Sequence, residues 1–300
     1  MSSAEIRTVA VVGAGAMGAM YAAHFVAGGL QTWLVATGER AERLRSGMTV
    51  NGEPLTAEVV DPEEASGRVA DLVLVAVKHQ QLAEAVELVA PVVSTETTFL
   101  SVLNGLDSEE TIAARFGREA VLPCIALAMD AERSASAVSF RQAGRLTFGP
   151  TEALGAAERV APVCAALDRA GLAYRVPEDM RHELWWKFMV NVGMNQASAV
   201  LRAPYGAFKA EGHPRSLMMA LIDEVLAVSA AEGVHLDESD VATWSEVLAG
   251  QPDQGVTSMH QDVMAGRPTE VEIFAGRVIE LGAKHGIPTP YNQAMRWILP

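Results

Sequence analysis

A glycine-rich turn near the N-terminus constrains the fold of this chain more than any other feature. Residues 7–12 (RTVAVV) form a short apolar run, residues 13–18 read GAGAMG, and an alanine-rich helical pattern follows. Gly28 and Gly29 end that pattern, and residues 31–36 (QTWLVA) have the composition of a second strand. This order of strand, glycine turn, helix and strand within about 30 residues predicts a dinucleotide-binding βαβ unit.

The three glycines of the turn have separate physical roles in such a unit. Gly13 permits the tight turn, Gly15 lets a pyrophosphate approach the backbone, and Gly18 lets the helix pack close to the strand. The phosphates then meet the N-terminus of the helix. The alternative is a glycine turn in an α/β domain that binds no nucleotide. The predicted cofactor-binding residues are Gly13, Ala14, Gly15, Ala16, Met17 and Gly18.

Strand-like and helix-like segments alternate through residues 1–178. Residues 71–77 (DLVLVAV) are almost continuously apolar, which is typical of a buried parallel strand. The alternation predicts a Rossmann-like doubly wound sheet. Further elements are expected as strands at 97–103, 120–126 and 174–176, a hairpin at 138–140 and 145–148, and helices at 81–89 and 158–170.

Two polar residues follow predicted strands at the edge of the sheet where ligands bind. Lys78 comes directly after the strand at 71–77, and Asn104 comes directly after the strand at 97–103. In an open parallel sheet the ligand crevice lies outside the carboxyl ends of the strands. Both residues are therefore candidates for ligand binding, although Lys78 fits a solvated strand end equally well.

The character of the chain changes after Pro177-Glu178-Asp179, where the alternation stops. No later segment has a convincing strand pattern, and glycine or proline ends several of the helical patterns. The sequence therefore predicts a dinucleotide-binding α/β domain at 1–178 and an all-α substrate domain at 179–300. Helices are expected at 180–200, 217–232, 238–248 and 270–285, with a short helix from residue 257.

A polar stripe lies on the first helix of the second half, which is otherwise apolar. Lys187, Asn191 and Asn195 are spaced i, i+4 and i+8, which puts them on one face of an α-helix. An ammonium and two amides are costly to bury unless polar groups meet them. The stripe predicts either a structural hydrogen-bond network or a substrate site with lysine as proton donor. Because the helix directly follows the predicted domain boundary, we expect it to face a cleft, which favours the substrate site.

The composition argues against several classes of function. The formal net charge of −14 argues against nucleic acid or an anionic membrane surface as a partner. The two cysteines, Cys124 and Cys164, have no metal-ligand spacing, which predicts reduced core residues in a cytoplasmic protein and no metal site. The N-terminus has no signal-peptide pattern, and no apolar run approaches the ~20 residues of a membrane span.

Six motifs, in order along nearly the whole chain, carry a family resemblance. They are GAGAMG at 13–18, VKHQQ at 77–81, NGL at 104–106, WWKFMVNVGMN at 185–195, SMHQDVMAGRPTEVEIFAG at 258–276 and HGIPTPYN at 285–292. Together they resemble the ketopantoate reductase (2-dehydropantoate 2-reductase) family. The glycine motif is shared with many dehydrogenases, whereas the lysine-asparagine helix and the block at 258–276 are much more specific.

The resemblance implies NADPH-dependent reduction of 2-dehydropantoate to pantoate in pantothenate biosynthesis. It implies that Lys187 is the catalytic proton donor and that Glu270 is a second catalytic residue. The implied contacts at the nicotinamide end of the cofactor are Lys78, Asn104 and Glu270. The implied substrate contacts are Asn104, Asn191, Asn195 and Ser258.

Two of these residues also have a structural explanation. Ser258 is a candidate N-cap of the short helix, with Gln261 as its capping-box partner. Glu270 is a candidate acid in the first turn of the long helix, where the helix dipole favours it. The family resemblance favours the functional roles of both.

One departure from the family pattern concerns the cofactor. The family commonly has an arginine after the second strand, where it binds the 2′-phosphate of NADPH, and Thr37 stands there in this chain. Arg40 or Arg43 is then the candidate phosphate ligand. Glu39 is the candidate acid for the ribose diol of NADH. We expect NADPH as cofactor, with NADH not excluded.

Further departures concern the substrate. Residues 123–129 are apolar where the family often has a Thr-His pair, and Tyr205 lies near a substrate-binding asparagine of some members. Gln196 stands where proline is common. These positions favour, as an alternative, reduction of a different 2-oxo acid. A non-catalytic dinucleotide-binding regulatory protein is a third possibility, and the resemblance makes a homodimer plausible.

Overall fold

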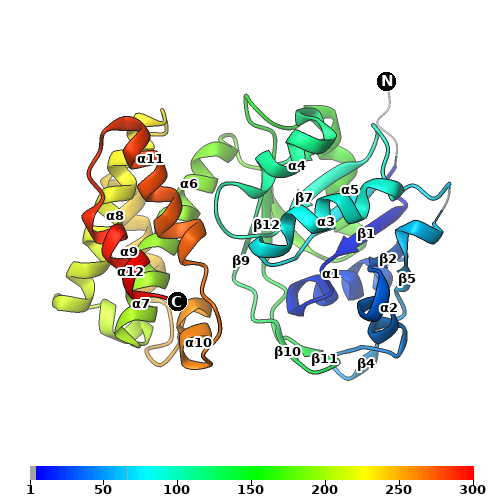
Figure 1. Cartoon of the computed structure of the whole chain (residues 1–300), viewed down its shortest axis with the longest axis horizontal. Helices are drawn as coiled ribbons and strands as arrows, with labels where there is room; N and C mark the ends of the chain where they lie inside the picture. Colours follow the sequence, from blue (N-terminus) through cyan, green and yellow to red (C-terminus); the bar gives the residue numbers. More distant parts are fainter. Residues whose placement is uncertain (1–4, 66) are drawn as a thin grey trace. The chain divides into compact units, whose positions relative to one another are not determined.

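The computed structural model describes residues 5–65 and 67–300, and the chain divides into two compact units, Met1–Met180 and Arg181–Pro300. In Figure 1 the N-terminal unit runs from blue to green and the C-terminal unit from light green to red. Among the described residues, the N-terminal unit contains the sheets and the C-terminal unit consists of helices. The predicted fold class is confirmed. The functional roles expected for 1–178 and 179–300 stay predictions.

Six parallel strands form the main sheet of the N-terminal unit, in the order β5-β2-β1-β6-β7-β8. After β1 the chain adds β2 and β5 on one side, and it then returns to the other side of β1 to add β6, β7 and β8. The point between β1 and β6 is therefore the switch point, where ligands bind in doubly wound sheets. The strands are β1 (Thr8–Val12), β2 (Gln31–Val35), β5 (Glu58–Val60), β6 (Leu72–Val75), β7 (Thr98–Ser101) and β8 (Val121–Leu122).

Helices cover both faces of this sheet, which explains why its central strands are apolar throughout. Val9 of β1 belongs to a core cluster with residues of α1 and α5, whereas the next residue, Ala10, belongs to a cluster with residues of α3 and α4. Strands buried on both faces need apolar side chains at every position. The four helices are α1 (Ala16–Ala27), α3 (Leu82–Val89), α4 (Ser108–Phe116) and α5 (Val160–Arg169).

The strand expected at 120–126 is wrong, because the structure has two strands there. Pro123 lies between β8, in the main sheet, and β9 (Cys124–Leu127), which pairs with β12 (Arg145–Phe148) in a separate sheet. Proline has no N–H to donate to a strand ladder. The chain therefore leaves the main sheet at this residue.

The hairpin expected at 138–140 and 145–148 is also wrong. β11 (Ala137–Ser139) pairs with β10 and β3, whereas β12 pairs with β9 and β13, so the two segments lie in different sheets. The Asp130 carboxylate accepts the backbone N–H of Gln142 at 2.8 Å and helps to turn the chain between them. The remaining strands are β3 (Thr49–Val50), β4 (Glu53–Pro54), β10 (Glu132–Ser134) and β13 (Ala173–Arg175).

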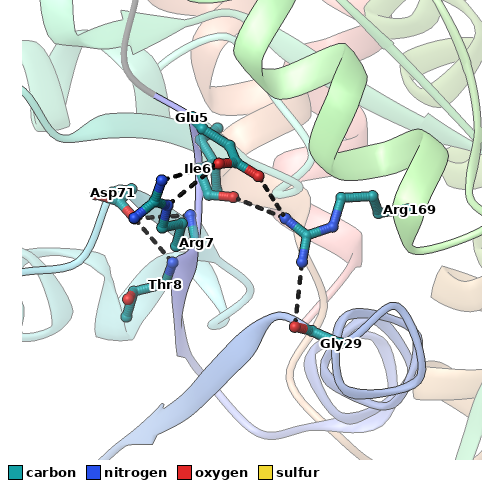
Figure 2. Close-up of polar contacts among 7 residues, drawn as sticks. All are labelled: Glu5, Ile6, Arg7, Thr8, Gly29, Asp71 and Arg169. Atoms are coloured by element: carbon teal, nitrogen blue, oxygen red, sulfur yellow. Dashed lines mark hydrogen bonds and ion pairs between the residues drawn. The ribbon is translucent and has the colours of Figure 1, made fainter.

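Two long-range contacts hold the start of β1 in place (Figure 2). The Arg169 side chain, at the end of α5, donates to the Glu5 carboxylate at 3.3 Å and to the Gly29 carbonyl oxygen at 3.2 Å. Asp71, just before β6, accepts the backbone N–H of Thr8 at 2.8 Å. The first strand is thereby tied to segments that lie far from it in the sequence.

The C-terminal unit contains one helix that the sequence did not predict. The last helix expected from the sequence ends at residue 285, but Pro290 opens a further helix, α12 (Pro290–Ile298), where its missing N–H costs nothing. Two π-helical segments, η6 and η8, interrupt the helices predicted at 180–200 and 270–285. The elements are α6 (Met180–Val190), η6 (Asn191–Asn195), α7 (Gln196–Leu201), α8 (His213–Ala231), α9 (Glu238–Ala249), α10 (Ser258–Met264), η8 (Glu272–Gly276), α11 (Arg277–His285) and α12.

Three further findings concern membrane-spanning helices, the two cysteines and clusters of possible metal ligands. Among residues 5–65 and 67–300, no helix combines the length and the apolar character needed to cross a membrane. Cys124 and Cys164 are free thiols, the first buried and the second half-buried. The same described residues contain no group of three or more His, Cys, Asp or Glu side chains arranged to hold a metal ion.

Candidate active site

The glycine turn between β1 and α1 has the geometry that the sequence predicts. Gly13 has a φ of +98°, and an added Cβ would lie 2.6 Å from the Ala76 carbonyl carbon, just after β6. An added Cβ at Gly18 would overlap the carbonyl oxygen of Gly13. Side chains at Gly13 and Gly18 are therefore excluded by the backbone itself.

Gly15 differs from its two neighbours because the space around it is open. Apart from its chain neighbours and its own helix, no heavy atom of the described residues lies within 4 Å of a Cβ built there. Gly15 is also the N-cap of α1 and has no side chain to satisfy the N–H groups of the first turn. Open space beside uncapped N–H groups suits a pyrophosphate, so these residues fit a dinucleotide.

Lys78 and Asn104 lie at the same edge of the sheet as the glycine turn. β6 lies between β1 and β7 in the parallel sheet, so the carboxyl ends of all three strands lie along one edge. Lys78 is exposed and precedes the short helix at His79–Gln81, and Asn104 is half-buried. The structure thus places both cofactor candidates at one edge of the sheet. The exposure of Lys78 also fits the alternative that it is a solvated strand end.

The region after β2 contains a cluster of arginines. Arg40 lies in α2 (Gly38–Arg45), and Arg133 of β10 donates from Nη1 to the Ala14 carbonyl oxygen at 2.7 Å. Burial, followed by the positive charges of Arg133 and Arg43, lowers the pKa of Arg40 from its usual value. Arg133 was missed by sequence reasoning because it lies 119 residues after Ala14 and on another sheet. No local motif pointed to it.

The carboxylate bonded to Thr37 is that of Asp61 and not that of Glu39. Glu39 is exposed on α2, whereas the Thr37 hydroxyl donates to Asp61 at 2.9 Å. Asp61 follows β5, which pairs with β2, so strand pairing brings it to this position. Asp61 also accepts the backbone N–H of Glu63 at 3.2 Å.

The predicted lysine-asparagine stripe lies on a continuous helix made of α6, η6 and α7. The sequence assumed regular α-helical spacing, but Asn191 to Asn195 is a π-helical turn. The two asparagines still share a face, because Asn195 Nδ2 donates to Asn191 Oδ1 at 3.3 Å. Lys187 lies four α-helical residues before Asn191, so it belongs to the same face, and all three side chains are half-buried.

Asn191 has an unused hydrogen-bond donor. Its Nδ2 atom is buried and has no partner among the described residues, although its Oδ1 is bonded to Asn195. Buried donors are rarely left without a partner, so such an atom calls for an explanation. A ligand that accepts a hydrogen bond would supply one.

The π-helical turn η6 packs closely against α8. An added Cβ at Gly193 would lie 2.5 Å from Cγ1 of Ile222. The second π-helical segment, η8, lies beside η6, and Phe274 of η8 packs against Phe188 of α6 with ring centroids 6.5 Å apart. Single π-turns inside α-helices are frequent at functional sites.

The structure excludes the structural explanation for Ser258, and its substrate contact stays a prediction. Thr257 is the N-cap of α10, because its side chain accepts the backbone N–H of His260 at 3.1 Å. The N-cap role suggested for Ser258 is therefore wrong, and Ser258 is exposed in the first turn. α10 packs against α7 and η6, so this turn belongs to the same region as the asparagines.

Glu270 lies one residue before the helical segment that was expected to start with it. The residue after it, Val271, begins the helical segment, and the backbone N–H of Ile273 donates to the Glu270 carbonyl oxygen at 3.2 Å. The side chain is half-buried. Because η8 lies beside η6, Glu270 precedes the segment next to the two asparagines.

Two of the three departures that concern the substrate, residues 123–129 and Tyr205, are apolar or aromatic in the structure. Cys124 and Ala126 of β9 point into the core of the N-terminal unit. Tyr205 is half-buried, and burial raises the pKa of its hydroxyl. An added Cβ at Gly255 would lie 2.9 Å from the Tyr205 ring, so this glycine makes room for the ring.

Comparisons with known proteins identify the class and the family. The family described as "Ketopantoate reductase PanE/ApbA" matches residues 9–153, and "Ketopantoate reductase PanE/ApbA C terminal" matches residues 179–298. The class is thus an oxidoreductase with a Rossmann-like N-terminal unit. The two matches cover most of the chain, and the protein belongs to the ketopantoate reductase family.

Individual relatives agree with this assignment at modest identity. The chain is 29% identical to a 2-dehydropantoate 2-reductase of Vibrio cholerae, over 96% of this chain and 95% of the relative. A 2-dehydropantoate 2-reductase from Geobacter metallireducens has a similar structure, with 26% identity, a TM-score of 0.83, and coverage of 97% and 98%. D-mandelate dehydrogenase with NADH and anilino(oxo)acetate has the same fold, at 20% identity, a TM-score of 0.86, and coverage of 97% and 96%.

Proposed function

We propose that this protein reduces 2-dehydropantoate to pantoate with NADPH, as a step of pantothenate biosynthesis. The observation that carries the proposal is the polar face of the α6–η6 helix, where a lysine precedes two asparagines and one buried amide donor has no partner in the part of the chain that the structure describes. The family to which the chain belongs supports the reaction type. Glycine residues 13, 15 and 18 provide the backbone geometry for the cofactor.

Lys187 is proposed as the proton donor. When bound, the nicotinamide supplies a hydride to the ketone carbon, and negative charge then develops on the ketone oxygen. The Lys187 ammonium stabilises this charge and delivers a proton to the oxygen, which gives the hydroxyl group of the product. Lysine suits this role because it is a compact charge with three N–H donors.

The two asparagines are proposed to orient the substrate. Asn191 Nδ2 donates to a carboxylate or hydroxyl oxygen of the 2-oxo acid, which satisfies the buried amide. Asn195 is held beside it by their mutual hydrogen bond. Neutral amides bind the substrate without adding charge next to Lys187, so the ammonium remains the dominant electrostatic feature.

The proposal of NADPH rests on the arginine cluster after β2. Arg40 and Arg133 come together near the glycine turn, and neither has an ion pair with a carboxylate among the described residues. Guanidinium groups bind phosphate with strong charge-assisted hydrogen bonds. Asp61 favours NADH instead, because a carboxylate accepts hydrogen bonds from a ribose diol, but its oxygens already bind Thr37 and the N–H of Glu63.

Replacement of the lysine tests the proposal. We expect Lys187→Ala to lower kcat for NADPH-dependent reduction of 2-dehydropantoate by about 10²–10⁴-fold, the usual contribution of a general acid. The dissociation constant of NADPH, measured by fluorescence, is expected to stay the same, because the glycine turn is intact. Normal turnover by this variant would rule out the proton-donor role.

Lys209→Ala is the matched control. Lys209 is also a half-buried lysine of the C-terminal unit, but it is bonded to the Gln251 carbonyl oxygen and to Asp253, each at 2.6 Å. Loss of this ion pair affects stability and is expected to leave kcat unchanged. An equal loss of kcat in both variants would show that the Lys187 effect comes from damage to the fold.

A second candidate function is reduction of a bulkier or more apolar 2-oxo acid by the same chemistry. The apolar strand β9 and the half-buried Tyr205 favour it. A protein of the same fold is named D-mandelate dehydrogenase and was solved with an aromatic oxo acid, anilino(oxo)acetate. Values of kcat/KM for a panel of 2-oxo acids, each measured with NADPH and with NADH, separate the two candidates. A substrate much better than 2-dehydropantoate would decide for the second.

A further inference from the structure

Three buried polar side chains connect η6 to two other helices, and the proposed chemistry uses none of them. Gln196, the first residue after η6, and Asn292 of α12 are fully buried, and Glu224 of α8 is 7% exposed. Gln196 Nε2 donates to Asn292 Oδ1 at 3.0 Å, and Asn292 Nδ2 donates to Glu224 Oε2 at 2.7 Å. Burial of such groups is costly unless they are hydrogen-bonded. Of their side-chain nitrogen and oxygen atoms, Gln196 Oε1 has no partner among the described residues, and the others are all hydrogen-bonded.

The Gln196 side chain donates to the backbone of the π-helical turn. In a regular α-helix the backbone N–H of Gln196 would donate to the carbonyl oxygen of Val192, four residues earlier. Here that N–H donates to the Gly193 carbonyl oxygen, three residues earlier, and the Gln196 side chain donates to the Val192 oxygen at 2.9 Å. The side chain thus provides the Val192 oxygen with a donor at the point where the Gln196 N–H is directed to Gly193.

Glu224 fixes the other end of the connection. Its carboxylate accepts the backbone N–H groups of Tyr291 at 2.7 Å and Asn292 at 3.0 Å, in the first turn of α12. A carboxylate is favoured at the N-terminus of a helix by the helix dipole. Asn292 is therefore bound through its backbone and its side chain, and it presents Oδ1 to Gln196 in one orientation.

We propose that Gln196, Asn292 and Glu224 are positioning residues that hold the π-helical turn and so orient the substrate-binding amides. This inference rests on the proposed function, because it assigns Asn191 and Asn195 to the 2-oxo acid. A π-helical turn closes hydrogen bonds over five residues instead of four, so its loss changes the direction of Asn195 relative to Lys187. The connection thus acts on substrate binding without touching substrate.

The test begins with Gln196→Leu, which keeps a similar volume and removes the donor. We expect the KM for the 2-oxo acid to rise about tenfold, while the dissociation constant of NADPH stays within about twofold, because the cofactor turn lies on the other unit. Hydrogen exchange of the backbone amides at 191–196 is expected to become faster. Unchanged exchange at 191–196 would overturn the role of Gln196 in holding the turn, and an unchanged KM would overturn its role in orienting the substrate.

Leu248→Ala controls for general loss of stability. Leu248 is a buried residue of α9 outside the three-residue connection. This variant is expected to unfold at a lower temperature with an unchanged KM for the 2-oxo acid. If Leu248→Ala raised KM as much as Gln196→Leu does, the effect would be one of stability, and the positioning role would be wrong.

A double-mutant cycle tests whether the residues act as one connection. Asn292→Leu is expected to raise KM in the same direction as Gln196→Leu, and the double variant is expected to be no worse than the stronger single variant. Additive effects would mean that the two residues act independently, which contradicts the proposal.

The exchange measurement also separates this proposal from the proposed function. If the wild-type protein reduced no 2-oxo acid, the proposed function would fail, and the positioning role would lose its kinetic readout. The exchange rates at 191–196 would still report whether Gln196 holds the π-helical turn. Unchanged rates in Gln196→Leu would overturn the structural part, whatever the substrate is.

Discussion

The glycine turn and the Lys187 helix differ in whether backbone or side-chain groups are proposed to bind the ligand. In the turn, side chains are excluded at Gly13 and Gly18 by neighbouring backbone atoms, so the proposed contacts to the cofactor come from the backbone. On the helix, the proposed contacts to the substrate come from side chains, and the backbone that carries Asn191 and Asn195 is π-helical. We therefore expect the glycine turn to be sensitive to added atoms and the Lys187 helix to be sensitive to lost hydrogen-bonding groups.

The largest expected effect comes from adding one carbon to the turn. Gly18→Ala would push a Cβ into the Gly13 carbonyl oxygen, so α1 would have to move away from the sheet. We expect a loss of about 3 kcal/mol in the free energy of unfolding, at the upper end for overpacking. Urea denaturation measures it. A variant as stable as the wild type would mean that the turn is not constrained by its backbone.

The second effect comes from removing a group on the helix. Asn191→Leu deletes the buried amide donor, and we expect kcat/KM for the 2-oxo acid to fall about 10–100-fold, the cost of a lost hydrogen bond to a charged partner. The free energy of unfolding is expected to fall by about 1 kcal/mol, because the variant also loses the oxygen that accepts from Asn195, whereas the Asn191 donor has no protein partner among the described residues. Steady-state kinetics and urea denaturation of one preparation measure both. Equal kcat/KM in variant and wild type would contradict the role of Asn191.

A smaller effect separates Gly15 from Gly18 within the turn. Gly15→Ala adds its methyl group to open space, so we expect the stability to change by less than about 0.5 kcal/mol. The dissociation constant of NADPH is expected to rise about tenfold, because the methyl group keeps the pyrophosphate from the backbone. Calorimetric titration measures it. Unchanged affinity would show that the dinucleotide does not approach Gly15.

The smallest expected effect concerns the choice between NADPH and NADH. Arg133→Gln removes an exposed guanidinium beside the turn, and we expect about a fivefold weaker binding of 2′,5′-ADP, since exposed charge pairs contribute about 1 kcal/mol or less. Binding of 5′-AMP, which lacks the 2′-phosphate, is expected to stay the same. Asp61→Asn is the matched variant for the opposite preference. Weaker NADH binding in Asp61→Asn, with no effect of Arg133→Gln, would reverse the cofactor assignment.

The sequence was most informative where the physical signal is local. The glycine turn, the apolar strand at β6 and the lysine-asparagine spacing each lie within a short window. The structure has the turn and the strand where the sequence predicts them, and it has a hydrogen bond between Asn191 and Asn195. Pro123 carried a local signal too, but it was read as part of one strand although proline interrupts a ladder. The same holds for Pro290, which fits the first turn of a helix as well as the end of one.

Other features could not be predicted because they depend on contacts between distant segments. Arg133 reaches Ala14 only after the second sheet has formed, and Asp61 meets Thr37 only through the pairing of β2 with β5. The π-helical turn depends on Asn292, which lies 96 residues after Gln196. The spacing of Lys187, Asn191 and Asn195 predicts one face of an ideal α-helix. It does not reveal that a π-helical turn interrupts this helix.

The position of β1 has a consequence for how the chain folds during synthesis. β1 is made first but lies in the interior of the sheet, between β2 and β6. The two edges of β1 are therefore paired only after residues 72–75 have been synthesised. An unpaired strand edge invites association with other chains. In the folded chain β6 covers this edge along residues 9–12, and Asp71, immediately before β6, extends the contact to the N–H groups of Arg7 and Thr8.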